Sequence, residues 1–98
     1  AAFEAALKEV PDSVDGRLGL GYSALRANDL ETAEPQFSFV LSVDAANVSA
    51  LVGLGHVRYR QGRFEDATAA MESALKLDSL NPEAQEILEK SRAGRKKK

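Results

Sequence analysis

The chain has 98 residues, 44% of them hydrophobic, and no cysteine, so its length allows one domain with a modest core. Without cysteine it has no disulfide, thiolate metal site or cysteine nucleophile. A cysteine-free chain fits the cytosol and also the periplasm, so the compartment stays open, with a cytoplasmic location preferred. No apolar run approaches the roughly 20 residues that a membrane span needs.

The charges are unevenly distributed along the chain. The net charge is −2, but five of the 13 basic residues lie in residues 92–98. Residues 1–91 therefore carry a net charge of −7, which does not favour a nucleic-acid binder. We expect residues 94–98 to form a basic disordered tail.

Apolar residues at helical spacing, separated by turn residues, divide the chain into six helices. Ser13, Asn47 and Asn81 each precede an apolar stretch and can act as N-caps. Asn28 and Gly62 fit the left-handed conformation that ends many helices. No stretch alternates apolar and polar residues, so we expect an all-α fold of antiparallel helix pairs. The predicted helices cover residues 1–10, 14–27, 30–43, 48–61, 64–78 and 82–93.

Residues 14–47 and 48–81 are two copies of one pattern with a period of 34 residues. A period of this length indicates an array in which each unit buries its apolar face on its neighbours. Gly21 and its counterpart Gly55 allow a partner helix to approach closely, whereas the sequence gives no reason for Gly53. The shift also aligns Leu20 with Leu54, Ala33 with Ala67, Phe37 with Met71 and Asp44 with Asp78.

This pattern resembles the tetratricopeptide repeat. The matching residues are Leu20, Gly21, Leu25, Asn28, Leu30, Ala33, Phe37 and Leu41 in the first copy, and Leu54, Gly55, Tyr59, Gly62, Phe64, Ala67, Met71, Ala74 and Leu75 in the second. The resemblance implies a right-handed α-solenoid over residues 1–93. Its parts would be the second helix of a truncated repeat (1–13), two repeats (14–47 and 48–81) and a capping or half-repeat helix (82–93). We expect this to be a fragment of a longer array.

The resemblance implies a non-enzymatic module that binds an extended peptide or helix of another protein in a concave groove. Tyrosine and arginine are common anchors in such surfaces, and residues three or four apart share one face of a helix. The alternative is that the aromatic residues pack on neighbouring helices while the arginines are solvated. The expected groove residues are Leu18, Tyr22, Arg26, Val52, His56, Tyr59 and Arg60.

A second hypothesis is a structural segment that self-associates into a homo-oligomer through exposed repeat ends. An apolar helix face without a neighbour is a typical association site. The residues expected at these ends are Phe3, Leu7, Val10, Ile87 and Leu88.

More specific chemistry finds little support. Chaperone-adaptor members of the family hold a C-terminal carboxylate with basic and amide side chains, but the matching positions here are Leu18, Tyr22, His56, Glu83 and Ile87. His56 is the only histidine and has no cysteine or nucleophile beside it in the sequence, so neither a metal site nor catalysis is expected. The glycine pairs lack the third glycine and the strand of a dinucleotide site. We predict no catalytic residue and no cofactor.

Overall fold

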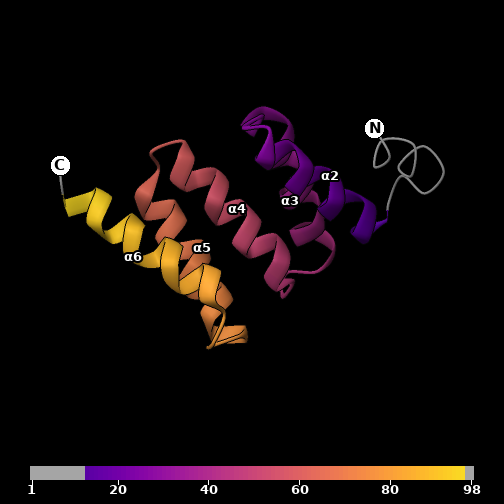
Figure 1. Cartoon of the computed structure of the whole chain (residues 1–98). Helices are drawn as coiled ribbons and strands as arrows, with labels where there is room; N and C mark the ends of the chain where they lie inside the picture. The colour runs from indigo at the N-terminus through magenta and orange to yellow at the C-terminus, as the bar shows by residue number, and fades with distance from the viewer. Residues whose placement is uncertain (1–12, 97–98) are drawn as a thin grey trace.

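The structure is a computed structural model, and it describes residues 13–96 as five α-helices (Figure 1). This range contains no strand, which confirms the predicted all-α helical solenoid. The helix expected at residues 1–10 lies outside the described residues. The helices are α2 (Val14–Arg26), α3 (Leu30–Val43), α4 (Val48–Arg60), α5 (Phe64–Leu77) and α6 (Pro82–Lys96).

The predicted capping residues start and end the helices as expected. The side-chain oxygens of Ser13, Asn47 and Asn81 each accept a hydrogen bond from the backbone N–H three residues later, at 3.2, 2.9 and 2.9 Å. Each bond satisfies one of the N–H groups that have no partner within the helix. Asn28 and Gly62 have φ angles of 59° and 78°, so both turns use the left-handed conformation that ends a helix.

Alternate helices form two layers. α2 contacts α4, and α4 contacts α6; in Figure 1 these three helices run in the same direction, from lower right to upper left. α3 packs against α2 and α4, and α5 packs against α4 and α6. Each helix pair is therefore completed by the first helix of the next pair, as the repeat predicts.

Phe37, at the junction of α3 with α4, has no exposed surface. Its ring lies over Gly21 of α2 and Gly53 of α4, and a β-carbon on either glycine would collide with the ring. The ring of Tyr22 meets it edge to face, with 4.9 Å between the centroids. Gly53 is thus explained by its contact with an aromatic residue of the preceding repeat.

Met71 takes the equivalent place at the junction of α5 with α6. It is fully buried, and its terminal methyl group lies against Gly55 of its own repeat. Ile87 of α6 stands 34 residues after Gly53 and belongs to the same core cluster as Met71. The second junction therefore combines a flexible side chain with a large partner, where the first combines a rigid ring with a glycine.

The polar groups at the two junctions differ as well. At the first, Glu34 of α3 accepts hydrogen bonds from Arg58 at 2.7 Å and from Gln61 at 3.0 Å. At the second, the hydroxyls of Thr68 and Ser91 are buried without a hydrogen-bond partner among the described residues. A buried hydroxyl without a partner destabilises the folded state.

α6 continues to Lys96, so the boundary expected at residue 93 is too early. The reason is Gly94, which lies against the ring of Phe64 at the start of α5, where a β-carbon would come within 2.9 Å of the ring. Residues 94–96 therefore continue the helix. Residues 97–98 lie outside the described part of the chain.

Candidate functional site

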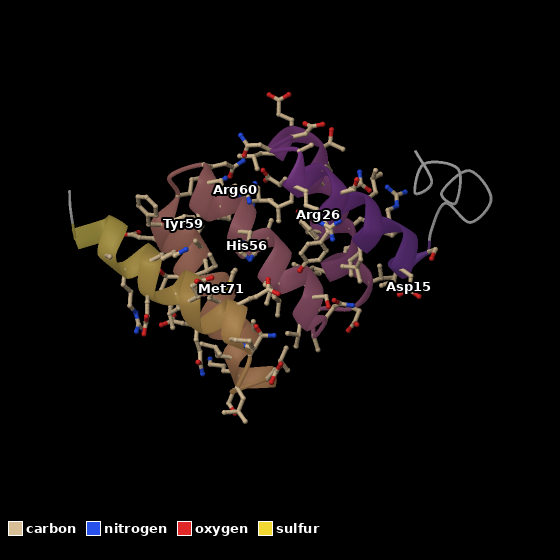
Figure 2. All side chains as sticks on the ribbon, viewed as in Figure 1. Asp15, Arg26, His56, Tyr59, Arg60 and Met71 are labelled. Carbon is tan, nitrogen blue, oxygen red and sulfur yellow. The ribbon has the colours of Figure 1, made fainter. Side chains whose placement is uncertain are left out.

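We call the exposed side of α2, α4 and α6 the three-helix face. Figure 2 shows Arg26, His56, Tyr59 and Arg60 on this face, with Asp15 at the opposite end of α2 from Arg26. The helical spacing of these residues explains why they share one side of their helices. The other expected groove residues are Leu18, Tyr22 and Val52.

Tyr22 connects the first repeat to the second. Its hydroxyl donates a hydrogen bond of 2.5 Å to the backbone carbonyl oxygen of Ser49 in α4. Burial, and after it the negative charge of Glu83, raises the pKa of Tyr22 to about 12. At neutral pH the phenol is therefore a stable hydrogen-bond donor, and its position is fixed by the contact with Phe37.

His56 connects α4 with α6. Its Nε2 lies 3.2 Å from Oε2 of Glu83 in the first turn of α6. The side chain of His56 is 20% exposed and that of Glu83 is 64% exposed, so the pair is partly open to solvent. Glu83 thus lies near both Tyr22 and His56, which sequence reasoning missed as a site residue although its place in the repeat matches Asp15 and Ser49.

Arg60 lies over the C-terminal end of α2. Its Nη1 donates to the carbonyl oxygen of Leu25 at 2.6 Å and lies 3.4 Å from Oδ1 of Asn28. This places the guanidinium close to Arg26, the residue that follows Leu25. Neither arginine has an ion-pair partner among residues 13–94, whereas Arg58 is paired with a glutamate.

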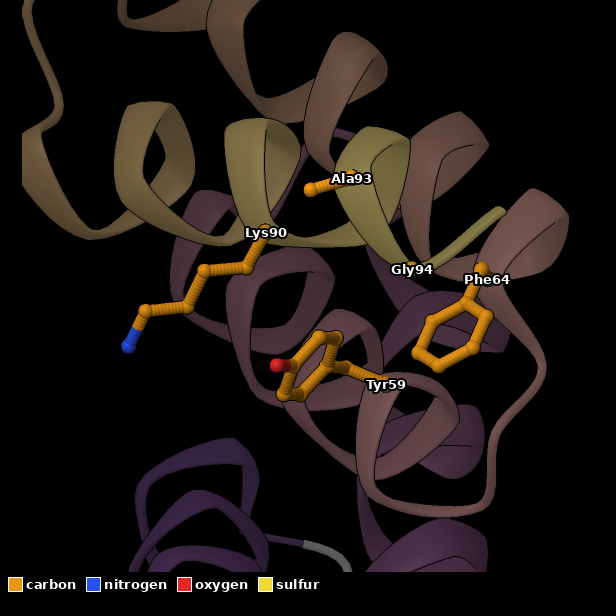
Figure 3. Close-up of a pocket in the computed structure, with 5 residues that line it drawn as sticks. All are labelled: Tyr59, Phe64, Lys90, Ala93 and Gly94. Atoms are coloured by element: carbon orange, nitrogen blue, oxygen red, sulfur yellow. The ribbon is translucent and has the colours of Figure 1, made fainter. Parts of the chain in front are cut away.

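Tyr59 contributes to a pocket that the sequence did not reveal. The pocket holds about 480 Å³ between the end of α4, the start of α5 and the end of α6. Figure 3 shows the ring of Tyr59 near that of Phe64, with 5.5 Å between their centroids, and Lys90 at the rim. The signal that could have found it is the small pair Ala93–Gly94, which leaves room beside two aromatic rings.

Two expected groove residues lie within the core. Val52 is 3% exposed and belongs to the cluster around Met71. Leu18 is half-buried and packs against the cluster around Phe37. They support the three-helix face from below and give it little surface of their own.

The structure changes the set of residues available for self-association. Ile87 is 4% exposed because it packs within the cluster around Met71, so it is wrong as an exposed end; Leu88 is half-buried against the same cluster. Phe3, Leu7 and Val10 lie outside the described residues. The large apolar side chains that are exposed are Val43, Leu77 and Leu80, at 64%, 51% and 83%.

The chemistry available on this face is that of binding. It offers a phenol, an imidazole, two guanidinium groups and an ammonium group, together with an aromatic pocket. Within the part of the chain that the structure describes, no three His, Cys, Asp or Glu side chains gather as a metal ion requires. None of the helices in this part is long and apolar enough to cross a bilayer.

Comparisons with known proteins agree with this architecture. The chain is similar to two proteins named "Cellulose synthase operon protein C". It is 47% identical over 57 residues to that of Xanthomonas axonopodis pv. citri (strain 306), covering 58% of this chain, and 38% identical over 61 residues to that of Komagataeibacter xylinus, covering 62%. The matches span only 4% and 5% of those proteins.

A solved structure has the same fold. The tetratricopeptide repeat domain of Arabidopsis OM64 superimposes with a TM-score of 0.87 over 93% of this chain and 75% of that chain, at 22% identity. Two family models, both described as tetratricopeptide repeat, match residues 24–91 and 1–38. Since the first of them covers more than half of the sequence, the chain belongs to the tetratricopeptide repeat family, and it is a helical repeat module for protein interaction.

Proposed function

We propose that the chain binds an extended peptide or a helix of another protein on the three-helix face, without catalysis. The observation that carries this proposal is that side chains from three successive helices meet there. Tyr22 comes from α2, His56 and Arg60 from α4, and Glu83 from α6. Hydrogen bonds between repeats hold these groups in place, which lowers the entropy cost of binding a partner.

The relatives suggest where a partner is to be found. Their name assigns them to a cellulose synthase operon, so we propose that the partner is another protein encoded in such an operon. Affinity capture from a lysate of a cellulose-producing bacterium, with mass spectrometry of the bound proteins, tests this. Capture of no protein of that operon would remove this choice of partner.

The binding face itself is tested with the variant Tyr22→Ala, Tyr59→Ala, Arg60→Ala. We expect it to lose partner capture while far-UV circular dichroism shows that the helices remain. Because Tyr22 packs on Phe37, a milder variant, Arg26→Gln with His56→Gln, separates binding from folding. A matched control changes exposed residues of α5, Glu65→Gln with Lys76→Gln, and should bind normally. Unchanged capture by both face variants would contradict the proposal.

Self-association remains a second proposal, now favoured by Leu77 and Leu80. Both side chains are more than half exposed, and they lie three residues apart at the end of α5 and the turn that follows it. Light scattering over a concentration series tests it. If the chain forms oligomers that Leu80→Glu dissociates, these residues form the contact; a monomer at all concentrations argues against self-association.

A further inference from the structure

From the charges on the three-helix face, we propose that its partner is an acidic segment carrying one large apolar side chain. This segment lies across the C-terminal ends of α2, α4 and α6. The inference rests on the proposed function and adds the chemistry of the partner to it. Arg26, Arg60 and Lys90 form what we call the basic edge, and the apolar side chain enters the pocket of Tyr59 and Phe64.

Contacts between the helices place the basic edge in order. Arg60 of α4 hydrogen-bonds to the carbonyl oxygen of Leu25, so its guanidinium reaches the end of α2 next to Arg26. Tyr59, which precedes Arg60, lines the same pocket as Lys90 of α6. The three cations therefore run from α2 over α4 to α6, and the pocket lies between the last two helices (Figures 2 and 3).

The positive charge of this edge is not neutralised within the described residues. Arg26 and Arg60 have no ion-pair partner there, and Lys90 has only a loose pair with Glu86 at 3.8 Å, in which both side chains are more than half exposed. Arg58 and Arg92, by comparison, each lie within 3.2 Å of a glutamate. Positive side chains left unpaired on a binding face favour a partner of negative charge.

The acidic residues of the face lie at the other ends of the same helices. Asp15 is in the first turn of α2 and Glu83 in the first turn of α6. Because α2, α4 and α6 run in the same direction (Figure 1), the face is positive along one edge and negative along the other. A partner with uniform negative charge is therefore attracted to the basic edge and repelled from Asp15 and Glu83.

The pocket defines the second part of the partner. Two aromatic rings, with the small residues Ala93 and Gly94 opposite, give an apolar space for a side chain such as phenylalanine or leucine. Lys90 at its rim adds one positive charge beside this space. An apolar residue flanked by carboxylates satisfies both features at once.

Fluorescence anisotropy with designed peptides tests the inference on the 98-residue chain. The probe is a fluorescein-labelled peptide of alternating glutamate and glycine with a central phenylalanine. One comparison peptide has lysine at every glutamate position, and another has serine in place of phenylalanine. We expect the acidic peptide to bind about tenfold more tightly than its lysine counterpart, with an affinity that falls as salt is added.

Two variants with equal charge locate the binding. Arg26→Gln with Lys90→Gln removes two positive charges from the basic edge and keeps the contact of Arg60 with Leu25. Lys97→Gln with Lys98→Gln removes two from the end of the chain. The first should weaken binding of the acidic peptide about five- to tenfold, and the second by less than about twofold. An equal loss in both variants would show attraction by net charge alone and overturn the inference.

A third variant tests the pocket. Ala93 is exposed, so Ala93→Phe fills the pocket without disturbing the core. It should abolish the preference for phenylalanine over serine and leave the preference for negative charge. If the lysine peptide binds as well as the acidic one, or if neither binds, the inference is wrong. Partner capture that depends on Tyr22, Tyr59 and Arg60 but not on Arg26 and Lys90 would retain the proposed function and reject only this inference.

Discussion

The junction between α3 and α4 and the junction between α5 and α6 stand at the same place in successive repeats, yet they are packed differently. The first places the ring of Phe37 over two glycines and adds an ionic network around Glu34. The second combines Met71 with Ile87 and buries two hydroxyls without partners. The repeat thus specifies the total volume at a junction rather than the residue at each position, and it leaves the C-terminal junction less well satisfied.

The largest difference is expected from truncating the two central side chains. Phe37→Ala should lower the free energy of unfolding by about 3–5 kcal/mol, because the void would be bordered by two glycines that cannot fill it. Met71→Ala should cost less, since the neighbouring side chains of its cluster can move inward. Urea unfolding followed by circular dichroism measures both. Equal losses would show that the two junctions are equally rigid.

A smaller difference is expected from adding a methyl group at the glycines. Gly53→Ala should destabilise the fold by about 1–2 kcal/mol, because overpacking against a buried ring exceeds the gain in helix propensity. Gly55→Ala should be nearly neutral, since it meets the end of the flexible Met71 side chain.

The double variant Gly53→Ala, Phe37→Leu provides the control for this effect. In the Phe37→Leu background, the added methyl group should cost little or be favourable, because the ring that it would meet is gone. A cost that does not change between the two backgrounds would contradict the explanation given for Gly53.

The unsatisfied hydroxyls offer a way to strengthen the second junction. Ser91→Ala should stabilise the fold by about 1 kcal/mol, because it removes a fully buried hydroxyl without a hydrogen-bond partner. Ser73→Ala, at an exposed position in α5, measures the gain from helix propensity alone. If both substitutions raise the thermal midpoint by the same amount, the hydroxyl of Ser91 is not a source of instability.

The smallest expected effect concerns pH at the first junction. The hydrogen bond from Gln61, together with the charge of Arg58, lowers the pKa of Glu34 below its ordinary value of 4.5. Its stabilising contribution is therefore present above pH 4.5 and lost as the pH falls through the lowered pKa. Glu34→Gln should remove this part of the acid sensitivity.

Glu72→Gln is the matched control at the second junction. Glu72 and its partner Arg92 are about half exposed, at 51% and 49%, so solvent screens this pair more strongly than that of Glu34. Thermal unfolding between neutral pH and pH 4 should separate the two variants. An acid dependence that is unchanged in Glu34→Gln would assign it to other carboxylates.

Features set by neighbours along the chain were predictable. Ser13, Asn47 and Asn81 were identified as caps from their place before an apolar stretch, because an N-cap bonds to a backbone group three residues away. Asp29 does the same at the start of α3, with a bond of 3.3 Å to the N–H of Thr32, and it was missed although its residue type is typical of an N-cap.

Features that depend on packing between repeats were harder to predict. The need for Gly53 arises from a ring 16 residues earlier in the chain, and nothing next to it in the sequence indicates that contact. Ile87 was expected at an exposed end because an apolar pattern shows which residues share a face but not which neighbour covers them. The pocket of Tyr59 was missed for the same reason, since residues from three helices form it. The role of the three-helix face stays a prediction.

Two contacts between repeats end on the main chain rather than on a side chain. Tyr22 donates to the carbonyl oxygen of Ser49, and Arg60 donates to that of Leu25. Every amino acid provides such an oxygen, so these contacts tolerate substitution at the accepting positions. The exposed Ser49 can therefore change over evolution, and with it the partner that is recognised, while the spacing of neighbouring repeats is preserved.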